Sequence, residues 1–291
     1  MTPVTDLTAS AATDERFSRK ATKGQRRGDE IHLLFDPPGP RARRRIRIAT
    51  AFSAVVLAAL LALAVRQFAL HGQLDRSQWW MFGQWPVQRF LLGGLGHTLL
   101  ATAVAAALAF PLGGVVAHGR LARNRLIRGT ARTYVELFRS VPLLLLMYIF
   151  LFGLPSTGLI FPVFWQLVIP IVLGNAAVVA EIYRAGVLNL PHGQTEAAYS
   201  IGMTHGQAMR YVVVPQALRT LAPALVSQLV RLLKDSTLGY VVSYLELLHQ
   251  AKVLGEYYHA VLSTYLVAAA AFIAVNAALS RTASYLEARR P

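Results

Sequence analysis

The sequence predicts an all-α membrane protein that crosses the bilayer several times, and three observations support this fold class. Hydrophobic residues make up 55% of the 291 positions and charged residues only 15%, with a mean hydropathy of +0.44. That balance is too apolar for a soluble domain, which needs a polar shell. Long apolar segments recur along the chain, and Lys and Arg gather between them, as the positive-inside rule expects. We therefore expect about six transmembrane helices.

The composition also excludes several classes of site. Cysteine is absent, so the chain has neither a disulfide framework nor a thiolate metal site. The net charge of +15 would suit nucleic acid, but its distribution follows the loops, so no nucleic-acid partner is expected. His97, His192 and His205 lack the spacing of a metal site or a proton relay, and we expect loop or packing roles for them.

Residues 1–47 are polar and basic and contain little that could build a core, so a disordered cytoplasmic tail is expected. Arginines at the end of this tail directly precede the first apolar segment, where they can hold the N-terminus inside and contact anionic lipid headgroups. Binding of nucleic acid by the tail is the alternative. A secretory signal peptide is not expected, because the tail is too long and further spans follow. These arginines are Arg41, Arg43, Arg44, Arg45 and Arg47.

Six apolar segments are long enough to cross a bilayer once their flanks are counted. The second is rich in Gly and Ala, which favours close helix packing in lipid, and the fourth contains Pro170, where a bend is expected. The segments are residues 48–65 (within a first helix assigned to 48–70), 91–117, 131–153, 161–187, 212–233 and 261–286.

Six spans that start from a cytoplasmic tail place residues 118–129, 191–215 and 287–291 in the cytoplasm. The first of these loops is rich in arginine and the last contains Arg289 and Arg290, whereas the segments on the other side contain few basic residues. Residues 71–90 are expected to be an amphipathic extracytoplasmic segment. Its three tryptophans favour the membrane interface, with substrate contact as the alternative. They are Trp79, Trp80 and Trp85.

Residues 194–215, QTEAAYSIGMTHGQAMRYVVVP, predict a polar helix-turn-helix between two spans. Small side chains after Glu196 let a short helix enter a shallow groove on a partner protein. Gly202 suits a left-handed turn that a β-carbon would penalise, and Pro215 suits the start of the next helix. An interfacial hairpin without a partner is the alternative.

This segment resembles the EAA loop of ABC importer permeases, E-A-A-x3-G-x9-I-x-L-P, with valines at 212 and 214 where Ile and Leu are usual. Further segments resemble the polar amino acid permeases of that class over about residues 91–286. The long tail and extra first helix are most similar to the glutamate-uptake permeases. The segments are GHTLL (96–100), YVELFRSVPLLLL (134–146), NAAVVAEIYRAG (175–186), LPHGQTEAA (190–198), PQALRTLAPAL (215–225), and LLKDSTLGY with LEL (232–247).

The resemblance implies the transmembrane domain of a type I ABC importer in a bacterial plasma membrane, with both termini cytoplasmic. It implies two ATPase subunits, a second permease that is a homologue or another copy, and an extracytoplasmic amino-acid-binding protein. Because the chain has no G-x4-G-K-[ST] loop, it is not expected to be an enzyme: the partner ATPase binds ATP and Mg²⁺, and this chain holds no cofactor. The expected substrate is glutamate or a related acidic or amide amino acid. The residues expected to couple to the ATPase are Gln194, Glu196, Ala197, Ala198, Gly202 and Pro215.

Polar residues within or near the spans are candidates for the substrate path or gate, because a charge at the bilayer centre costs about 2.5–3.5 kcal/mol on insertion scales. Glu181 and Arg184 could instead pair with each other at i,i+3, and Lys234 could extend to the interface. As a gate, Lys234 and Asp235 would meet the carboxylate and ammonium of a zwitterion. Arg139 is a weaker candidate. The candidates are Asn175, Glu181, Arg184, Lys234, Asp235 and Ser236.

Two other functions remain open from the residues alone. An ion-coupled secondary amino acid transporter would need paired acidic residues near the middle of the membrane and would not need the helix-turn-helix. A membrane anchor would act through its basic tail, by binding nucleic acid or lipids.

Overall fold

The computed structural model describes residues 39–288, without the side chains of residues 192 and 283–288. Within this range the chain is helical and contains no strand, which confirms the all-α fold class. The chain divides into two units, Met1–Leu70 and His71–Pro291. The structure of residues 1–38, and of Arg289 and Arg290, lies outside the described residues.

The described part of the first unit is one helix, α2 (Pro40–Leu70). It contains the expected first span but begins eight residues before it, so residues 40–47 are helical and not part of a disordered tail. Proline is well suited to the first turn of a helix, and arginine is a good helix former. None of its residues is buried, and its exposed apolar side chains suit contact with lipid.

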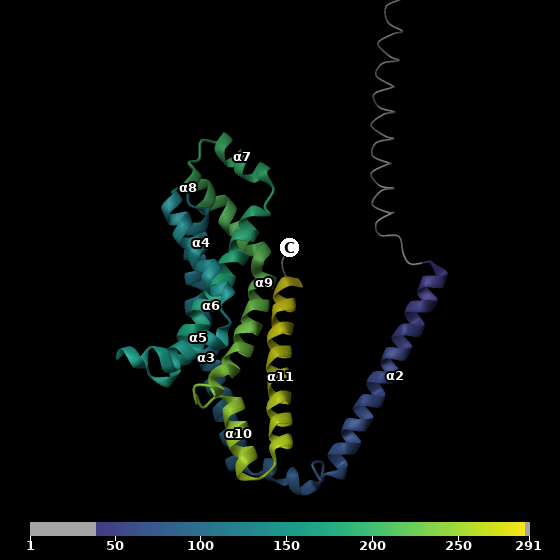
Figure 1. The fold of residues 1–291 in the computed structure, drawn as a ribbon. Helices are drawn as coiled ribbons and strands as arrows, with labels where there is room; N and C mark the ends of the chain where they lie inside the picture. The colour runs from purple at the N-terminus through teal and green to yellow at the C-terminus, as the bar shows by residue number, and fades with distance from the viewer. Residues whose placement is uncertain (1–38, 289–291) are drawn as a thin grey trace, which may run out of the picture. The chain divides into compact units, whose positions relative to one another are not determined.

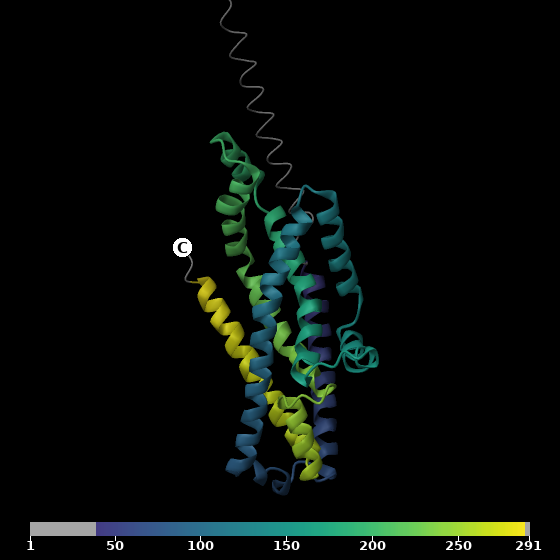
Figure 2. The same ribbon diagram turned by 90° about the vertical axis from the view of Figure 1, so that its left-hand side faces the viewer.

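The second unit is a helical bundle. Figures 1 and 2 show α3, α6, α9 and α11 running along one another, with α7 and α8 at one end of the bundle and α10 at the other. Its elements are η1 (Arg76–Gln78), η2 (Trp80–Gly83), α3 (Trp85–Leu121), α4 (Arg125–Ser140), α5 (Leu143–Tyr148), the π-helix η3 (Ile149–Gly153), η4 (Pro155–Thr157), α6 (Val163–Leu188), α7 (His192–Ser200), α8 (His205–Ala208), the π-helix η5 (Met209–Val213), α9 (Val214–Asp235), η6 (Ser236–Tyr240), α10 (Leu247–Tyr257) and α11 (Val261–Ala288).

Fewer helices than expected meet the length and apolarity of a membrane span. Four do so in the described chain, namely α2, α3, α6 and residues 261–282 of α11. A fifth is added if α4 and the following helical segment count as one bent span. The expected fifth span, α9, is long enough, but Arg219, Arg231, Lys234 and Asp235 make it more polar than the others.

The expected span over 131–153 is bent. The chain bends by 97° between α4 and the segment that starts at Leu143. Val141 has an extended backbone, with φ −87° and ψ 124°, because the ring of Pro142 disfavours a helical conformation in the residue before it. The helix therefore ends at Ser140 and restarts in a new direction.

The core lies where α3 packs against α6. A β-carbon added to Gly113 would lie 2.5 Å from Cγ1 of Val179 and 2.9 Å from the carbonyl oxygen of Ala176, so only glycine fits at this point. Helices α6 and α9 also lie close together at one glycine: a β-carbon on Gly186 would lie 2.4 Å from Cγ of Leu221. Small residues thus bring the helix backbones together. The buried alanines around the first contact are Ala105, Ala106, Ala109, Ala176 and Ala177.

Helix α10 was not expected from the sequence, which indicated no helix between the spans 212–233 and 261–286. It packs between α3 and α11. Glu246 precedes it and is fully buried, and its carboxylate accepts hydrogen bonds from the backbone N–H groups of Leu248 at 2.8 Å and His249 at 2.5 Å. This is an N-terminal cap. Burial raises the pKa of Glu246 to about 7, although these two hydrogen bonds act in the opposite direction.

The contact between α3 and α6 can be tested with two neighbouring glycines. Gly113→Ala should lower the free energy of unfolding by about 1–3 kcal/mol, the usual cost of overpacking. Gly114→Ala is the matched control, because its β-carbon would meet only the Tyr183 ring, at 3.4 Å. Thermal unfolding in detergent should show a lower midpoint for the first variant, and equal midpoints would contradict the packing described here.

Candidate functional site

The segment 191–215 folds as the expected helix-turn-helix at one end of the bundle (Figure 1). Helix α7 ends at Ser200, and Gly202 has φ +81°, the left-handed conformation that the sequence predicted for it. The backbone N–H of Gly202 donates to the Tyr199 carbonyl at 2.9 Å and that of Met203 to the Ala198 carbonyl at 3.1 Å. These two bonds form a Schellman motif, which stops α7 and turns the chain toward α8.

Helix α8 begins with a capping box. The hydroxyl of Thr204 accepts a hydrogen bond from the backbone N–H of Gln207 at 3.4 Å, and the Gln207 side chain accepts one from the backbone N–H of Thr204 at 2.8 Å. The hydroxyl of Tyr199 contacts Nδ1 of His205 at 2.8 Å, so the two short helices are joined by side chains as well as by the turn.

The helix-turn-helix is also joined to the bundle. Nε2 of Gln216 donates to Oε1 of Gln194 at 3.0 Å, which links α7 to the first turns of α9. The π-helix η5 leads from α8 into α9, and Pro215 lies in the first turn of α9, as expected from the sequence. The α7–α8 segment is therefore joined to the start of α9 both through the chain and through a side-chain hydrogen bond.

The outer surface of this segment is exposed and partly apolar. Glu196 and Ala197 are exposed, whereas Ala198 is buried at 3% exposure and anchors α7. Ile201 is 74% exposed and Tyr211 62%. Within residues 39–288, Glu196 forms no ion pair with Lys, Arg or His. Exposed apolar residues and an unpaired carboxylate on the same segment suit a surface that binds another protein.

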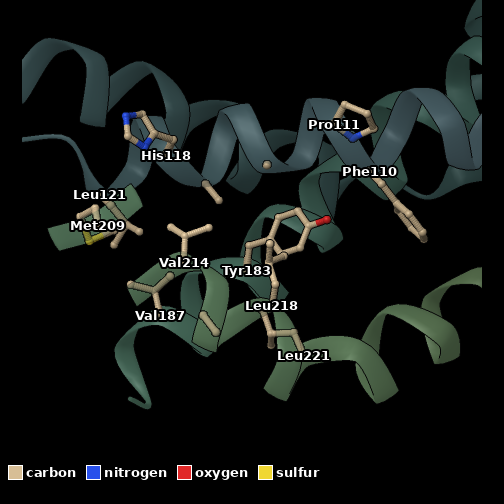
Figure 3. A pocket seen from close by; sticks show the side chains of 13 residues that line it. Phe110, Pro111, His118, Leu121, Tyr183, Val187, Met209, Val214, Leu218 and Leu221 are labelled. Carbon is tan, nitrogen blue, oxygen red and sulfur yellow. The ribbon is translucent and has the colours of Figure 1, made fainter. Parts of the chain in front are cut away.

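An apolar cavity of about 420 Å³ lies between α3, α6 and the start of α9. Figure 3 shows α3 with Pro111 and His118 on one side of it, and Tyr183 and Val187 of α6 with Val214 and Leu218 of α9 on the other. Protein interiors are usually packed without large voids. The space beside the start of α9 is not filled by side chains of α3 or α6.

A second cavity, of about 460 Å³ and lined by many polar groups, lies toward the other end of α9. It is formed where α4 breaks into α5, against α6 and α9. Arg139, Asn175, Arg231 and Asp235 contribute its charged and amide side chains. We call it the polar cavity.

Asn175 organises the wall of the polar cavity. It is 3% exposed, and its Nδ2 donates to Oδ2 of Asp235 at 2.9 Å. Its Oδ1 accepts from Nε2 of Gln228 at 2.5 Å. These bonds join α6 to α9 and satisfy polar groups that would be costly to bury unpaired.

The other candidate residues lie elsewhere. Lys234 is exposed and does not line the polar cavity. Ser236 is fully buried, where its hydroxyl accepts from Thr102 at 3.2 Å and donates to the Leu233 carbonyl at 2.8 Å. The polar cavity instead contains Arg231, which sequence reasoning missed, although its position one turn before Asp235 on α9 placed it on the same face.

Glu181 and Arg184 pair with each other, which is the alternative that their i,i+3 spacing offered. Nε of Arg184 donates to Oε1 of Glu181 at 3.0 Å. Arg120 of α3 also pairs with Glu181, a contact that the sequence did not indicate. The three side chains join the ends of α3 and α6. A charge in a membrane protein is least costly when paired in this way.

The fold and the exposed helix-turn-helix match a class of protein, namely the membrane-spanning subunits of transporters. The family model described as "Binding-protein-dependent transport system inner membrane component" matches residues 109–290. The chain belongs to this family, and it is a multi-pass membrane protein.

Relatives confirm the predicted resemblance to amino acid permeases of ABC importers. The chain is 36% identical over 198 residues to a probable glutamine ABC transporter permease protein of Bacillus subtilis, covering 68% of this chain and 92% of the relative. It is 34% identical over 227 residues to a glutamate transport system permease protein of Corynebacterium glutamicum, covering 75% and 81%.

Solved structures of ABC transporters also share the fold of this chain. A crystal structure of an amino acid ABC transporter with histidines is 32% identical, with a TM-score of 0.67, over 70% of this chain and 95% of that one. The MetNI methionine ABC transporter, at 24% identity and a TM-score of 0.56 over 69% and 98%, shares the fold.

The turn at Gly202 can be tested locally. Gly202→Ala should destabilise the end of α7 by about 1–2 kcal/mol, because a β-carbon disfavours the left-handed conformation. Gly206→Ala is the matched control: Gly206 lies in α8, and an added β-carbon would have no neighbour within 4 Å. Limited trypsin digestion should cleave after the exposed Arg210 faster in the first variant. Equal rates would show that Gly202 does not hold the turn.

Proposed function

We propose that this chain is the permease subunit of an ATP-driven importer for polar amino acids, of which glutamate or its amide is the expected substrate. The exposed α7–α8 segment carries the proposal, because it presents a carboxylate and apolar side chains at the end of a helix that leads to the polar cavity. Membership of the transport family supports it.

The proposed assembly contains two ATPase subunits, which bind ATP and Mg²⁺, and two permeases. An extracytoplasmic binding protein delivers the amino acid. In this assembly α7 and α8 dock on an ATPase, and both termini of the permease are cytoplasmic. Closure of the ATPase pair moves the segment and shifts the permease between outward-open and inward-open states, since ATP supplies the differential contacts that such a shift requires.

The polar cavity is the proposed substrate contact. An acidic amino acid carries two carboxylates and one ammonium group. Arg139 and Arg231 supply two guanidinium groups, which bind carboxylates well, and Asp235 supplies a carboxylate for the ammonium. In this structure Asp235 accepts from Asn175 at 2.9 Å, so its position on the cavity wall is already fixed. Asn175 thus positions the group that meets the substrate.

The names of the relatives support this substrate class. They include probable glutamine permeases of Bacillus subtilis, a glutamate permease of Corynebacterium glutamicum and a glutamate/aspartate import permease of Escherichia coli. An arginine transport permease of Bacillus subtilis is also related, at 35% identity. Two arginines against one aspartate favour the acidic substrates over the basic one.

Reversal of one charge tests the docking role of α7. Glu196→Lys should abolish most ATP-dependent uptake and reduce the ATPase that copurifies with the solubilised chain, because a like charge at a protein interface is repelled. Glu256→Lys is the control, because Glu256 is also an exposed glutamate but lies on α10, at the other end of the bundle (Figure 1). Uptake assays in cells and mass spectrometry of copurified proteins give the two readouts.

The proposal fails if Glu196→Lys transports normally and the chain purifies alone. An ion-coupled transporter would then be favoured, because such a protein needs no ATPase.

The polar cavity is tested by two basic residues that lie three positions apart on α9. Arg231→Gln should lower the maximal uptake rate about ten- to a hundredfold, the range expected for a lost charged hydrogen bond of about 1.5–3 kcal/mol. Lys234→Gln is the matched control, because Lys234 does not line the cavity. Uptake is measured at saturating substrate with equal expression, and equal loss in both variants would contradict this site.

A further inference from the structure

A third cavity, of about 500 Å³, lies beside α4 at the ends of α3 and α6. Five arginines line it, together with Glu136, Leu121, Gly129 and Leu188. We call it the arginine cavity. The arginines are Arg120, Arg125, Arg128, Arg132 and Arg184.

The arginine cavity has more positive charge than its carboxylates neutralise. Arg120 and Arg184 share Glu181, and Arg132 pairs with Glu136. Within residues 39–288, Arg125 and Arg128 form no ion pair. Five guanidinium groups against two carboxylates leave an excess of three positive charges around one hollow.

The helical spacing directs these charges to one side. Arg125, Arg128 and Arg132 lie at i, i+3 and i+7 on α4, so they share a face of that helix. Arg128 donates to the Ala122 carbonyl at 3.4 Å, just past the end of α3. The positive-inside rule accounts for basic residues in this loop, but it does not account for their convergence with Arg184 of α6 on one cavity. Mutually repelling charges held this closely favour a bound anion.

The surroundings indicate what carries the anion. Arg120 lies in the last turn of α3, and Leu188 is the last residue of α6, so the cavity lies at the depth where spans meet the headgroups. Apolar side chains on the same elements are exposed, including Leu126 at 78%, Ile127 at 50% and Leu188 at 55%. An amphiphile with an anionic head satisfies both the guanidinium groups and these side chains.

We propose that the arginine cavity binds the phosphate headgroup of an anionic phospholipid. Arg125 and Arg128 donate to the phosphate, and Arg132 and Arg184 complete a positive rim. The Arg120–Glu181–Arg184 ion pairs hold the cavity walls together across α3 and α6. The bound lipid would thus connect α4 to the two helices that form the core.

The test uses the purified transporter complex in nanodiscs made with either phosphatidylglycerol or phosphatidylcholine. After mild delipidation, native mass spectrometry should detect retained phosphatidylglycerol on the wild-type protein. The variant Arg125→Gln/Arg128→Gln should retain it at least roughly fivefold more weakly, since each basic residue near a membrane contributes about that factor. Arg44→Gln/Arg45→Gln is the control for general attraction, because it removes two arginines of α2 that do not line the cavity.

Arg125→Gln alone serves as a second variant if the double variant is poorly folded, because Arg125 is exposed.

Addition of inorganic phosphate distinguishes a site for a lipid headgroup from a site for any small anion. Equal retention in all variants would overturn the proposal. So would no retention by the intact complex, which would indicate that a partner subunit covers the cavity, and so would displacement of the lipid by phosphate alone.

Discussion

The close packing of α3 against α6 is the constraint on which the rest of the second unit depends. Lipid offers no hydrophobic driving force between helices, so association requires close van der Waals contact. Gly113 and the surrounding alanines provide it by leaving room for the backbone of α6. At one end of the pair, Arg120, Glu181 and Arg184 join the same two helices by charge. Apolar packing along the helices and ion pairing at their ends thus hold α3 and α6 together as one rigid pair. Helices α4, α9 and α10 pack against this pair.

Helix α9 departs from this apolar pattern. Two of its polar side chains are satisfied within the unit, because Gln228 and Asp235 both bond to Asn175 of α6. Arg231 and Lys234 are exposed, and charged side chains in membrane proteins usually face water or another protein rather than lipid. A polar helix beside an apolar bundle is therefore consistent with the proposed assembly, in which a second permease lies beside this chain.

The sequence predicted the features that local chemistry determines. Gly202 and Pro215 could be assigned because a left-handed turn and a helix start each depend on one residue and its neighbours. The break before Pro142 follows from the same kind of rule. It was not predicted because the apolar residues continue across Pro142 and were interpreted as one span. Helix α10 was missed because Glu246, His249 and Gln250 interrupt an apolar pattern that only packing against α3 and α11 makes helical. The pairing of Arg120 with Glu181 and of Asn175 with Asp235 could not be predicted, since each joins residues about 60 positions apart.

Helix α9 is also the physical link between the two proposed sites. Its 22 residues extend over about 33 Å at 1.5 Å per residue. One end continues from the α7–α8 segment and borders the apolar cavity. The other end carries Arg231 and Asp235, and Asp235 is bound to Asn175 of α6. Coupling between distant sites requires an element whose position both sites can influence. In the proposed transport cycle, a displacement of the α7–α8 segment can therefore reach the polar cavity through α9 without passing through the closely packed α3–α6 pair.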